Sequence, residues 1–213
     1  MLGQVARQIG FDCVLPGGIA FLCTEAPSDY NICQSQRSRE GINAMAETPQ
    51  EYQARMKKHT EGKSPLKLQA AAAKRIERLL KGVPAGKLRK RPAPGKWSVA
   101  EIVAHMADTE IVGGFRMRFI LGAPGTPIQG FDQDGWVVAL HYDKRDPRKA
   151  LEQFRVLRET NLAMLKTLSP EQWKHHGMHS ERGEESIETI VRMFAGHDLN
   201  HIQQIERILA PKK

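Results

Sequence analysis

Long apolar runs are missing from the sequence: no stretch of 18 or more apolar residues occurs, which excludes a membrane-spanning helix. Cysteine is also scarce. The chain has three cysteines, Cys13, Cys23 and Cys33. An odd number of cysteines does not form a disulfide framework, and their regular ten-residue spacing matches no zinc-binding pattern. We therefore expect a protein of the reducing cytoplasm.

Aromatic residues are few, at 6% of the chain, and none interrupts the densest basic run, Lys87–Arg91. Nucleic-acid sites commonly combine basic with aromatic side chains, so this run is a weak candidate for one. The formal net charge is +8, but both signs are mixed along most of the chain, as on an ordinary solvated surface. We expect a small-molecule partner, and neither a nucleic-acid nor a membrane partner.

Residues 1–44 differ from the rest of the chain, because they hold all three cysteines, no lysine and no sustained periodicity. A signal peptide is a poor fit, since only Arg7 precedes the apolar part and residues 12–18 interrupt it. Arg39-Glu40-Gly41 can be encoded by a purine run that resembles a ribosome-binding site, just upstream of Met45. Our hypothesis is that residues 1–44 are a translated leader and that Met45 is the true start. The alternative is a genuine disordered tail.

Residues 45–213 show helical periodicity and no convincing strand. Ser98-Val99-Ala100-Glu101 is a capping box, which marks a helix start. A short helix is predicted from Pro49 to about Glu61. Four long amphipathic helices are predicted over Pro65 to about Lys81, Ser98 to about Leu121, Pro147 onward, and Ser186 to about Leu209. The fold class is therefore an all-α four-helix bundle.

A long connection separates the second and third of these helices, from Leu121 to Asp146, roughly 25 residues. Connections of that length in a compact domain are usually functional segments or crossovers. This one allows the second and third long helices to run parallel instead of antiparallel.

Two histidines, His197 and His201, interrupt the apolar stripe of the last helix and lie one turn apart. Such a pair can direct two imidazole nitrogens at one metal ion. The alternative is a pair of hydrogen-bonded core histidines, although two imidazoles buried together leave ring N–H groups to satisfy. His105, on the second long helix, is the best candidate for a third ligand. Its rivals are expected to be solvated in a polar loop: His175, His176 and His179.

Two segments, Pro94–His105 and Gly196–Ile205, resemble the DinB-like, or YfiT-like, metalloprotein superfamily. The resemblance covers about residues 50–209. It implies an up-down-down-up four-helix bundle, with His105, His197 and His201 as metal ligands. It also implies a homodimer and an activity like that of metal-dependent transferases for low-molecular-weight thiols, such as bacillithiol and mycothiol.

From this resemblance we expect a divalent transition metal, zinc or nickel, and transfer of a thiol onto an electrophile. Three neutral histidines leave the ion its charge and an open position, where a thiol loses its proton easily. The alternative is a non-catalytic, stress-associated metal-binding module. The expected substrate contacts are Asp132, Trp136 and Asn161.

Three further residues are expected near the site. Asp108 and Asp198 could orient the ligand histidines through hydrogen bonds. His179, ahead of Gly183, is interpreted as structural or pocket-lining and not as a ligand.

Overall fold

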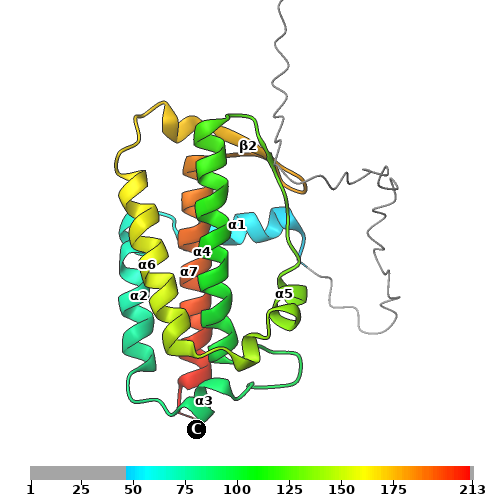
Figure 1. Cartoon of the computed structure of the whole chain (residues 1–213), viewed down its shortest axis with the longest axis vertical. Helices are drawn as coiled ribbons and strands as arrows, with labels where there is room; N and C mark the ends of the chain where they lie inside the picture. The colour runs from blue at the N-terminus through cyan, green and yellow to red at the C-terminus, as the bar shows by residue number, and fades with distance from the viewer. Residues whose placement is uncertain (1–46, 212–213) are drawn as a thin grey trace, which may run out of the picture. The chain divides into compact units, whose positions relative to one another are not determined.

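A computed structural model describes residues 47–211, in which four long helices form a bundle (Figure 1). These helices are α2 (Pro65–Leu80), α4 (Val99–Gly122), α6 (Pro147–Leu165) and α7 (Ile187–Leu209). Helices α4 and α6 lie side by side and run in the same direction, while α2 and α7 run the opposite way. The predicted all-α, up-down-down-up bundle is confirmed. The predictions for residues 1–44 lie outside the described residues.

Local capping explains where the long helices begin. The Ser98 hydroxyl accepts from Glu101 N–H at 3.3 Å, and the Glu101 carboxylate accepts from Ser98 N–H at 2.7 Å, so the predicted capping box is present. The Asp146 side chain caps α6 by accepting from the N–H groups of Arg148 and Lys149, and the Ser186 hydroxyl caps α7 by accepting from Thr189 N–H. Each side-chain oxygen satisfies a backbone N–H that has no partner within its helix.

The crossover between α4 and α6 is structured. It holds β1 (Pro127–Ile128), helix α5 (Gln133–Ala139) and the 3₁₀ turn η1 (Tyr142–Lys144). It runs back along the outside of α4 (Figure 1). The prediction of a long crossover is therefore confirmed, and its chain covers one side of the second long helix.

The expectation that the chain lacks strands is wrong. Strands β2 (His176–His179) and β3 (Gly183–Ser186) form an antiparallel hairpin, and β1 pairs with β2 in parallel. A Cβ at Gly177 would lie 2.7 Å from the Ile128 side chain, so glycine permits this pairing. Strands of two to four residues are held by backbone hydrogen bonds and are too short to show an alternating pattern.

Shorter elements close the ends and one side of the bundle: α1 (Pro49–His59), α3 (Ala85–Arg89) and the 3₁₀ turn η2 (Gln172–Lys174). Helix α1 crosses the bundle and packs on α7 (Figure 1). A Cβ at Gly196 would lie 2.4 Å from the Met56 carbonyl oxygen, so the two backbones meet at this glycine. The close approach fixes α1 directly beside His197.

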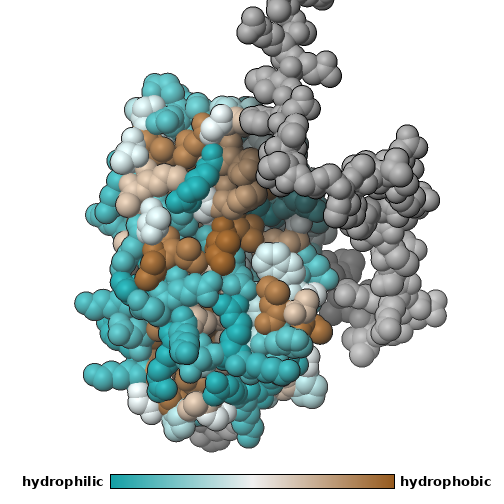
Figure 2. Space-filling view, in the orientation of Figure 1, coloured by the Kyte–Doolittle hydropathy of each residue, from teal (hydrophilic) through white to brown (hydrophobic). Residues whose placement is uncertain are grey.

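Apolar side chains fill the space between the long helices. Among residues 47–211 no helix is long and apolar enough to cross a membrane. A few large apolar side chains also stay exposed on α4 and α6: Ile111, Phe115, Phe119 and Val156. Brown patches are visible on the face that these two helices present in Figure 2. Scattered exposure of this kind is common in globular proteins.

Candidate metal centre

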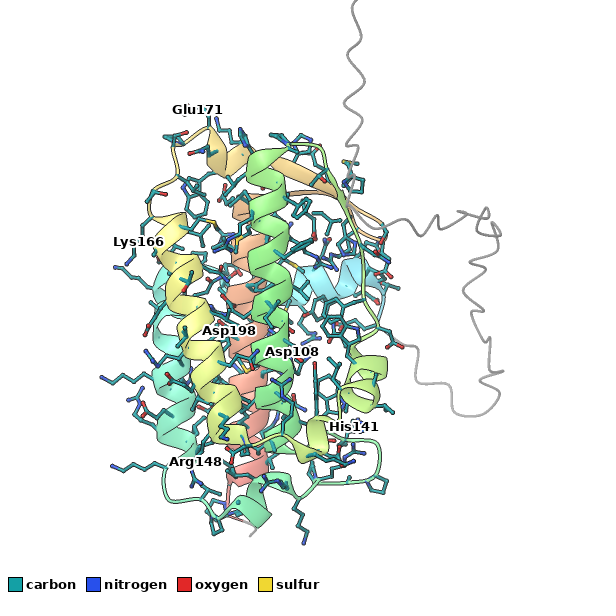
Figure 3. All side chains as sticks on the ribbon, viewed as in Figure 1. Asp108, His141, Arg148, Lys166, Glu171 and Asp198 are labelled. Atoms are coloured by element: carbon teal, nitrogen blue, oxygen red, sulfur yellow. The ribbon has the colours of Figure 1, made fainter. Side chains whose placement is uncertain are left out.

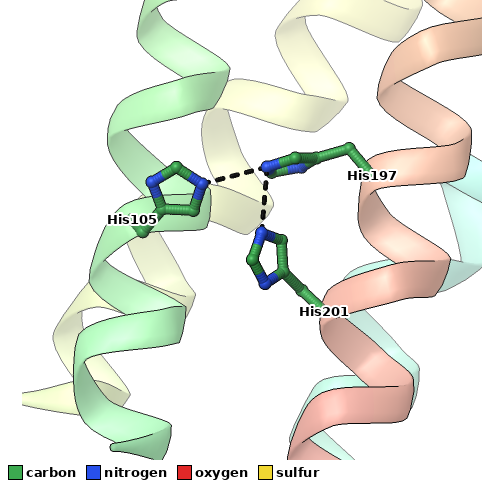
Figure 4. A group of neighbouring side chains, drawn as sticks. All are labelled: His105, His197 and His201. Atoms are coloured by element: carbon green, nitrogen blue, oxygen red, sulfur yellow. Dashed lines mark hydrogen bonds between the residues drawn. The ribbon is translucent and has the colours of Figure 1, made fainter. Parts of the chain in front are cut away.

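Three histidines from two helices meet inside the bundle (Figure 4). His105 comes from α4, and His197 and His201 come from α7. The Nε2 atom of His197 lies 3.0 Å from that of His105 and 3.1 Å from that of His201. All three side chains are buried, with at most 7% exposed. Among the described residues, this is the group of histidine, cysteine and acidic side chains placed to hold one metal ion.

Gln204 fixes the orientation of one of these rings. Its side-chain oxygen lies 3.1 Å from His201 Nδ1. Because an amide oxygen only accepts, Nδ1 carries the proton and the Nε2 lone pair is free to bind a metal. Sequence reasoning missed this role, although Gln204 follows His201 by three residues and so shares its helix face.

The surroundings keep all three imidazoles neutral. Burial holds the pKa values of His105 and His197 well below their usual range, and it lowers the pKa of His201 to about 4. A neutral imidazole is the form that binds a metal. In a tetrahedral zinc site with Zn–N of about 2.0–2.1 Å, ligand nitrogens stand about 3.3 Å apart. The observed 3.0 and 3.1 Å separations from His197 are close to this value, and all three ligand nitrogens lie within 4.8 Å of one another, so the residues fit a bound ion.

Trp97 covers one side of the three histidines. Its ring centroid lies 4.9 Å from that of His105, and it stacks on His201 with a centroid distance of 6.4 Å and an interplanar angle of 9°. The Thr109 hydroxyl lies 3.4 Å from His105 Nε2. Trp97 therefore packs directly against two of the three histidines.

The expectation that Asp108 and Asp198 orient the histidines is wrong. Asp108 accepts from Arg145 at 2.7 Å, and Asp198 accepts from Arg158 at 2.5 and 3.1 Å. Figure 3 labels both aspartates at mid-height in the bundle. Successive residues on a helix point about 100° apart, so Asp198 follows His197 in the chain but faces another neighbour.

Arg158 is a buried cation that sequence reasoning also missed. Its guanidinium binds Glu110 at 2.8 Å, Asp198 at 2.5 Å and the Gln69 carbonyl oxygen at 3.2 Å. These partners come from α4, α7 and α2, and Arg158 itself comes from α6. One buried side chain therefore connects all four long helices, and its partner Asp198 directly follows His197 in the chain.

The candidate substrate contacts have structural partners. Asp132 caps α5 by accepting from Gly135 N–H at 3.0 Å, and Trp136 packs on Phe131 with centroids 4.6 Å apart. Asn161 donates to the Glu110 carboxylate at 2.8 Å. None of the three lines the pocket described below, and their role in binding substrate stays a prediction.

The expectation that His179 is solvated is wrong. It is 4% exposed, and its Nδ1 accepts from Glu181 N–H at 3.1 Å. The β2–β3 hairpin, which the sequence did not reveal, folds this side chain inward. The interpretation of His179 as structural agrees with this arrangement, and it lies outside the group of three histidines.

A narrow pocket of about 60 Å³ opens beside His197, enough for a few water molecules. Its walls come from α1, α4, α7, the crossover and the hairpin. Its lining includes apolar Val112, Ile190, Met193 and Phe194, and polar Thr109, Arg116, Arg182 and Glu185. The pocket therefore reaches His197, and its wall is partly apolar and partly charged.

The neutral histidines predict how the metal-free protein responds to acid. The unfolded chain, whose histidines have a pKa of about 6.5, binds more protons below that pH than the folded chain does. Stability is therefore lost as the pH falls from about 6.5 towards 4, by about 1.4 kcal/mol per pH unit for each histidine. Urea unfolding at pH 7.5 and 5.5 measures this loss. The double variant His197→Gln/His201→Gln should lose clearly less stability over this pH range, because two of the buried histidines are gone, and equal losses would contradict the prediction.

Comparison with known proteins agrees with this architecture. The chain is 25% identical over 115 residues to YfiT of Bacillus subtilis, which is named as a candidate metal-dependent hydrolase. The match covers 54% of this chain and 65% of YfiT, so the chain spans just under two thirds of the length of that relative. A second protein so named, from Oceanobacillus iheyensis, is 25% identical over 119 residues, covering 55% of this chain and 68% of its own length. The solved structure of YfiT from Bacillus subtilis is described as a four-helix bundle of unusual topology. It matches 79% of this chain and 93% of its own chain, with a TM-score of 0.61 and 18% sequence identity. This match shows that the two proteins share a fold.

A family comparison covers the site as well as the fold. The sequence model described as the DinB superfamily matches residues 68–205, which is more than half of the chain. The matched range includes His105, His197 and His201. The chain therefore belongs to the DinB superfamily.

Proposed function

We propose that this chain is a metal-dependent enzyme that transfers a low-molecular-weight thiol onto an electrophile, with His105, His197 and His201 holding a divalent transition metal. The carrying observation is the cluster of three buried, neutral histidines, of which His197 lines a pocket. Zinc or nickel held by these histidines would supply a cationic position that favours the thiolate form of a thiol.

The chain's own residues prepare this position. Gln204 keeps the proton of His201 on Nδ1, so that Nε2 faces its neighbours. Trp97 covers the histidines, and the apolar wall of Val112, Ile190 and Phe194 limits the water that reaches them. A site with little water strengthens the attraction between a cation and an anionic sulfur.

Hydrolysis is the second candidate, because the relatives are named as candidate metal-dependent hydrolases. Hydrolytic sites commonly use a carboxylate or histidine to take the proton of the attacking water. Within residues 47–211 no carboxylate is hydrogen-bonded to the three histidines. Glu185 lines the pocket, but Arg182 holds it at 2.6 Å and Gln53 at 3.2 Å. A thiol, with a pKa of about 8.5, has less need of a separate base, which supports the thiol reaction.

Turnover by the zinc- or nickel-loaded protein tests the proposal. We expect conjugation of monochlorobimane with at least one thiol of a panel, at least tenfold faster than with the metal-free protein or with His197→Ala. Hydrolysis of simple esters without any thiol effect would favour the second candidate. No rate in either assay, with the metal site filled, would leave the non-catalytic, stress-associated metal-binding module.

A further inference from the structure

The pocket has two ends that lie along the bundle axis. Thr109 and Arg116 line it from α4, and His197 and Ile190 line it from α7. Each pair is separated by seven residues, which is about 10 Å of helix. Because α4 and α7 run in opposite directions, Thr109 lies with His197 at one end and Arg116 lies with Ile190 at the other.

Arg116 is a cation without an acidic partner at that far end. Its guanidinium donates to the Gln129 carbonyl oxygen and lies over the Phe131 ring, 5.8 Å from the centroid. Among residues 47–211 no carboxylate lies within ion-pair distance of it. Partial burial and the neighbouring Arg182 lower its pKa, while Glu185 and Glu181 act against this from a distance. A partly desolvated charge of this kind is stabilised by an anion.

Arg182 differs from Arg116 because its charge is already matched. It donates to both carboxylate oxygens of Glu185, at 2.6 and 2.9 Å, and Glu185 is 1% exposed. The two groups form a closed pair. The unmatched positive charge on the pocket wall therefore belongs to Arg116.

We propose that Arg116 determines substrate specificity by binding a carboxylate at the end of the pocket opposite the histidines. This rests on the proposed function, in which the histidine end binds a sulfur-bearing group through the metal. The guanidinium fork matches a carboxylate with two parallel hydrogen bonds, and the narrow passage favours a flat carboxylate over a bulkier phosphate. The implied substrate is slender, with sulfur at one end, an apolar middle against Val112 and Phe194, and a carboxylate at the other end.

A matched pair of probes tests this assignment: 6-mercaptohexanoate and its methyl ester. Both are titrated into the cobalt-loaded protein, and the sulfur-to-cobalt charge-transfer absorption reports binding at the histidine end. We expect the acid to bind at least tenfold more tightly than the ester. Arg116→Gln should remove this difference by weakening the acid alone. The control Arg192→Gln removes the same charge from a residue of α7 that pairs with Glu188 outside the pocket, and it should behave as the unchanged protein does.

The outcomes separate this proposal from the proposed function. Absorption with both probes at equal affinity, or a preference for the acid that survives in Arg116→Gln, would overturn the role of Arg116 and leave the metal–thiol site standing. If neither the acid nor the ester produced the charge-transfer absorption, that result would count against the thiol reaction. In that case, calorimetry of the metal-free protein with the same acid and ester still decides the carboxylate site, because heat of binding that depends on Arg116 requires no metal.

Discussion

Replacing Arg158 by methionine is expected to lower the free energy of unfolding by about 3–5 kcal/mol. The substitution leaves Glu110 and Asp198, each at most 3% exposed, buried without their cation. An uncompensated buried charge costs several kcal/mol, whereas a formed buried pair contributes little net stability. Urea unfolding of the metal-free protein measures the change without a contribution from the site.

Arg155→Met is the matched control for this prediction. Arg155 lies on the same helix, but its ion pairs with Glu152 and Glu159 are exposed, so its loss should cost at most about 1 kcal/mol. The variant Arg158→Met/Glu110→Gln/Asp198→Asn should recover part of the stability, because it removes the buried charges together. If Arg158→Met were as mild as Arg155→Met, the buried network would have no special weight in the fold.

Removing one histidine of the site is expected to abolish metal binding. The chain, purified without a histidine tag and reconstituted with zinc or nickel, should hold about one equivalent, and His197→Ala should hold close to none by mass spectrometry. Since a ligand at 1,000 times its Kd stabilises a protein by about 4 kcal/mol, metal should raise the melting temperature of the unchanged chain and not that of the variant.

His59→Ala serves as the control for metal content. His59 lies in the last turn of α1, outside the group of three histidines, so this variant should keep the full equivalent. Equal metal content in His197→Ala and His59→Ala would show that the ion binds elsewhere. If the unchanged chain and both variants held no metal even after reconstitution, the three histidines would be a structural cluster and not a metal site.

The sequence predicted those features that depend on local spacing. The periodicity of the long helices, the capping box at Ser98 and the one-turn interval between His197 and His201 follow from the geometry of a single helix. The length of the crossover predicted that the second and third long helices run parallel. His105 was the best third ligand by its place on the second long helix, and the family resemblance supported its pairing with the last helix.

The features that were missed depend on how helices are rotated against one another. Asp108 and Asp198 were assigned to the histidines, but packing turns them towards Arg145 and Arg158. A buried arginine such as Arg158 reads in the sequence as a surface charge among others. The hairpin that buries His179 is held by backbone hydrogen bonds, which leave no mark in side-chain composition. Gln204, in contrast, could have been found from its spacing to His201.

The parallel pairing of α4 and α6 limits how this chain can evolve by deletion. Glu110 lies beside Arg158, so the start of α6 lies level with the start of α4, and the crossover must return over about 35 Å from Gly122 to Pro147. About ten extended residues would be enough for that distance, and the crossover uses more than twice as many. The surplus includes Phe131 and Gln133, which line the pocket. Descendants with shortened crossovers could keep the bundle while losing that wall, so crossover length should separate members that share a substrate from members that share only the fold.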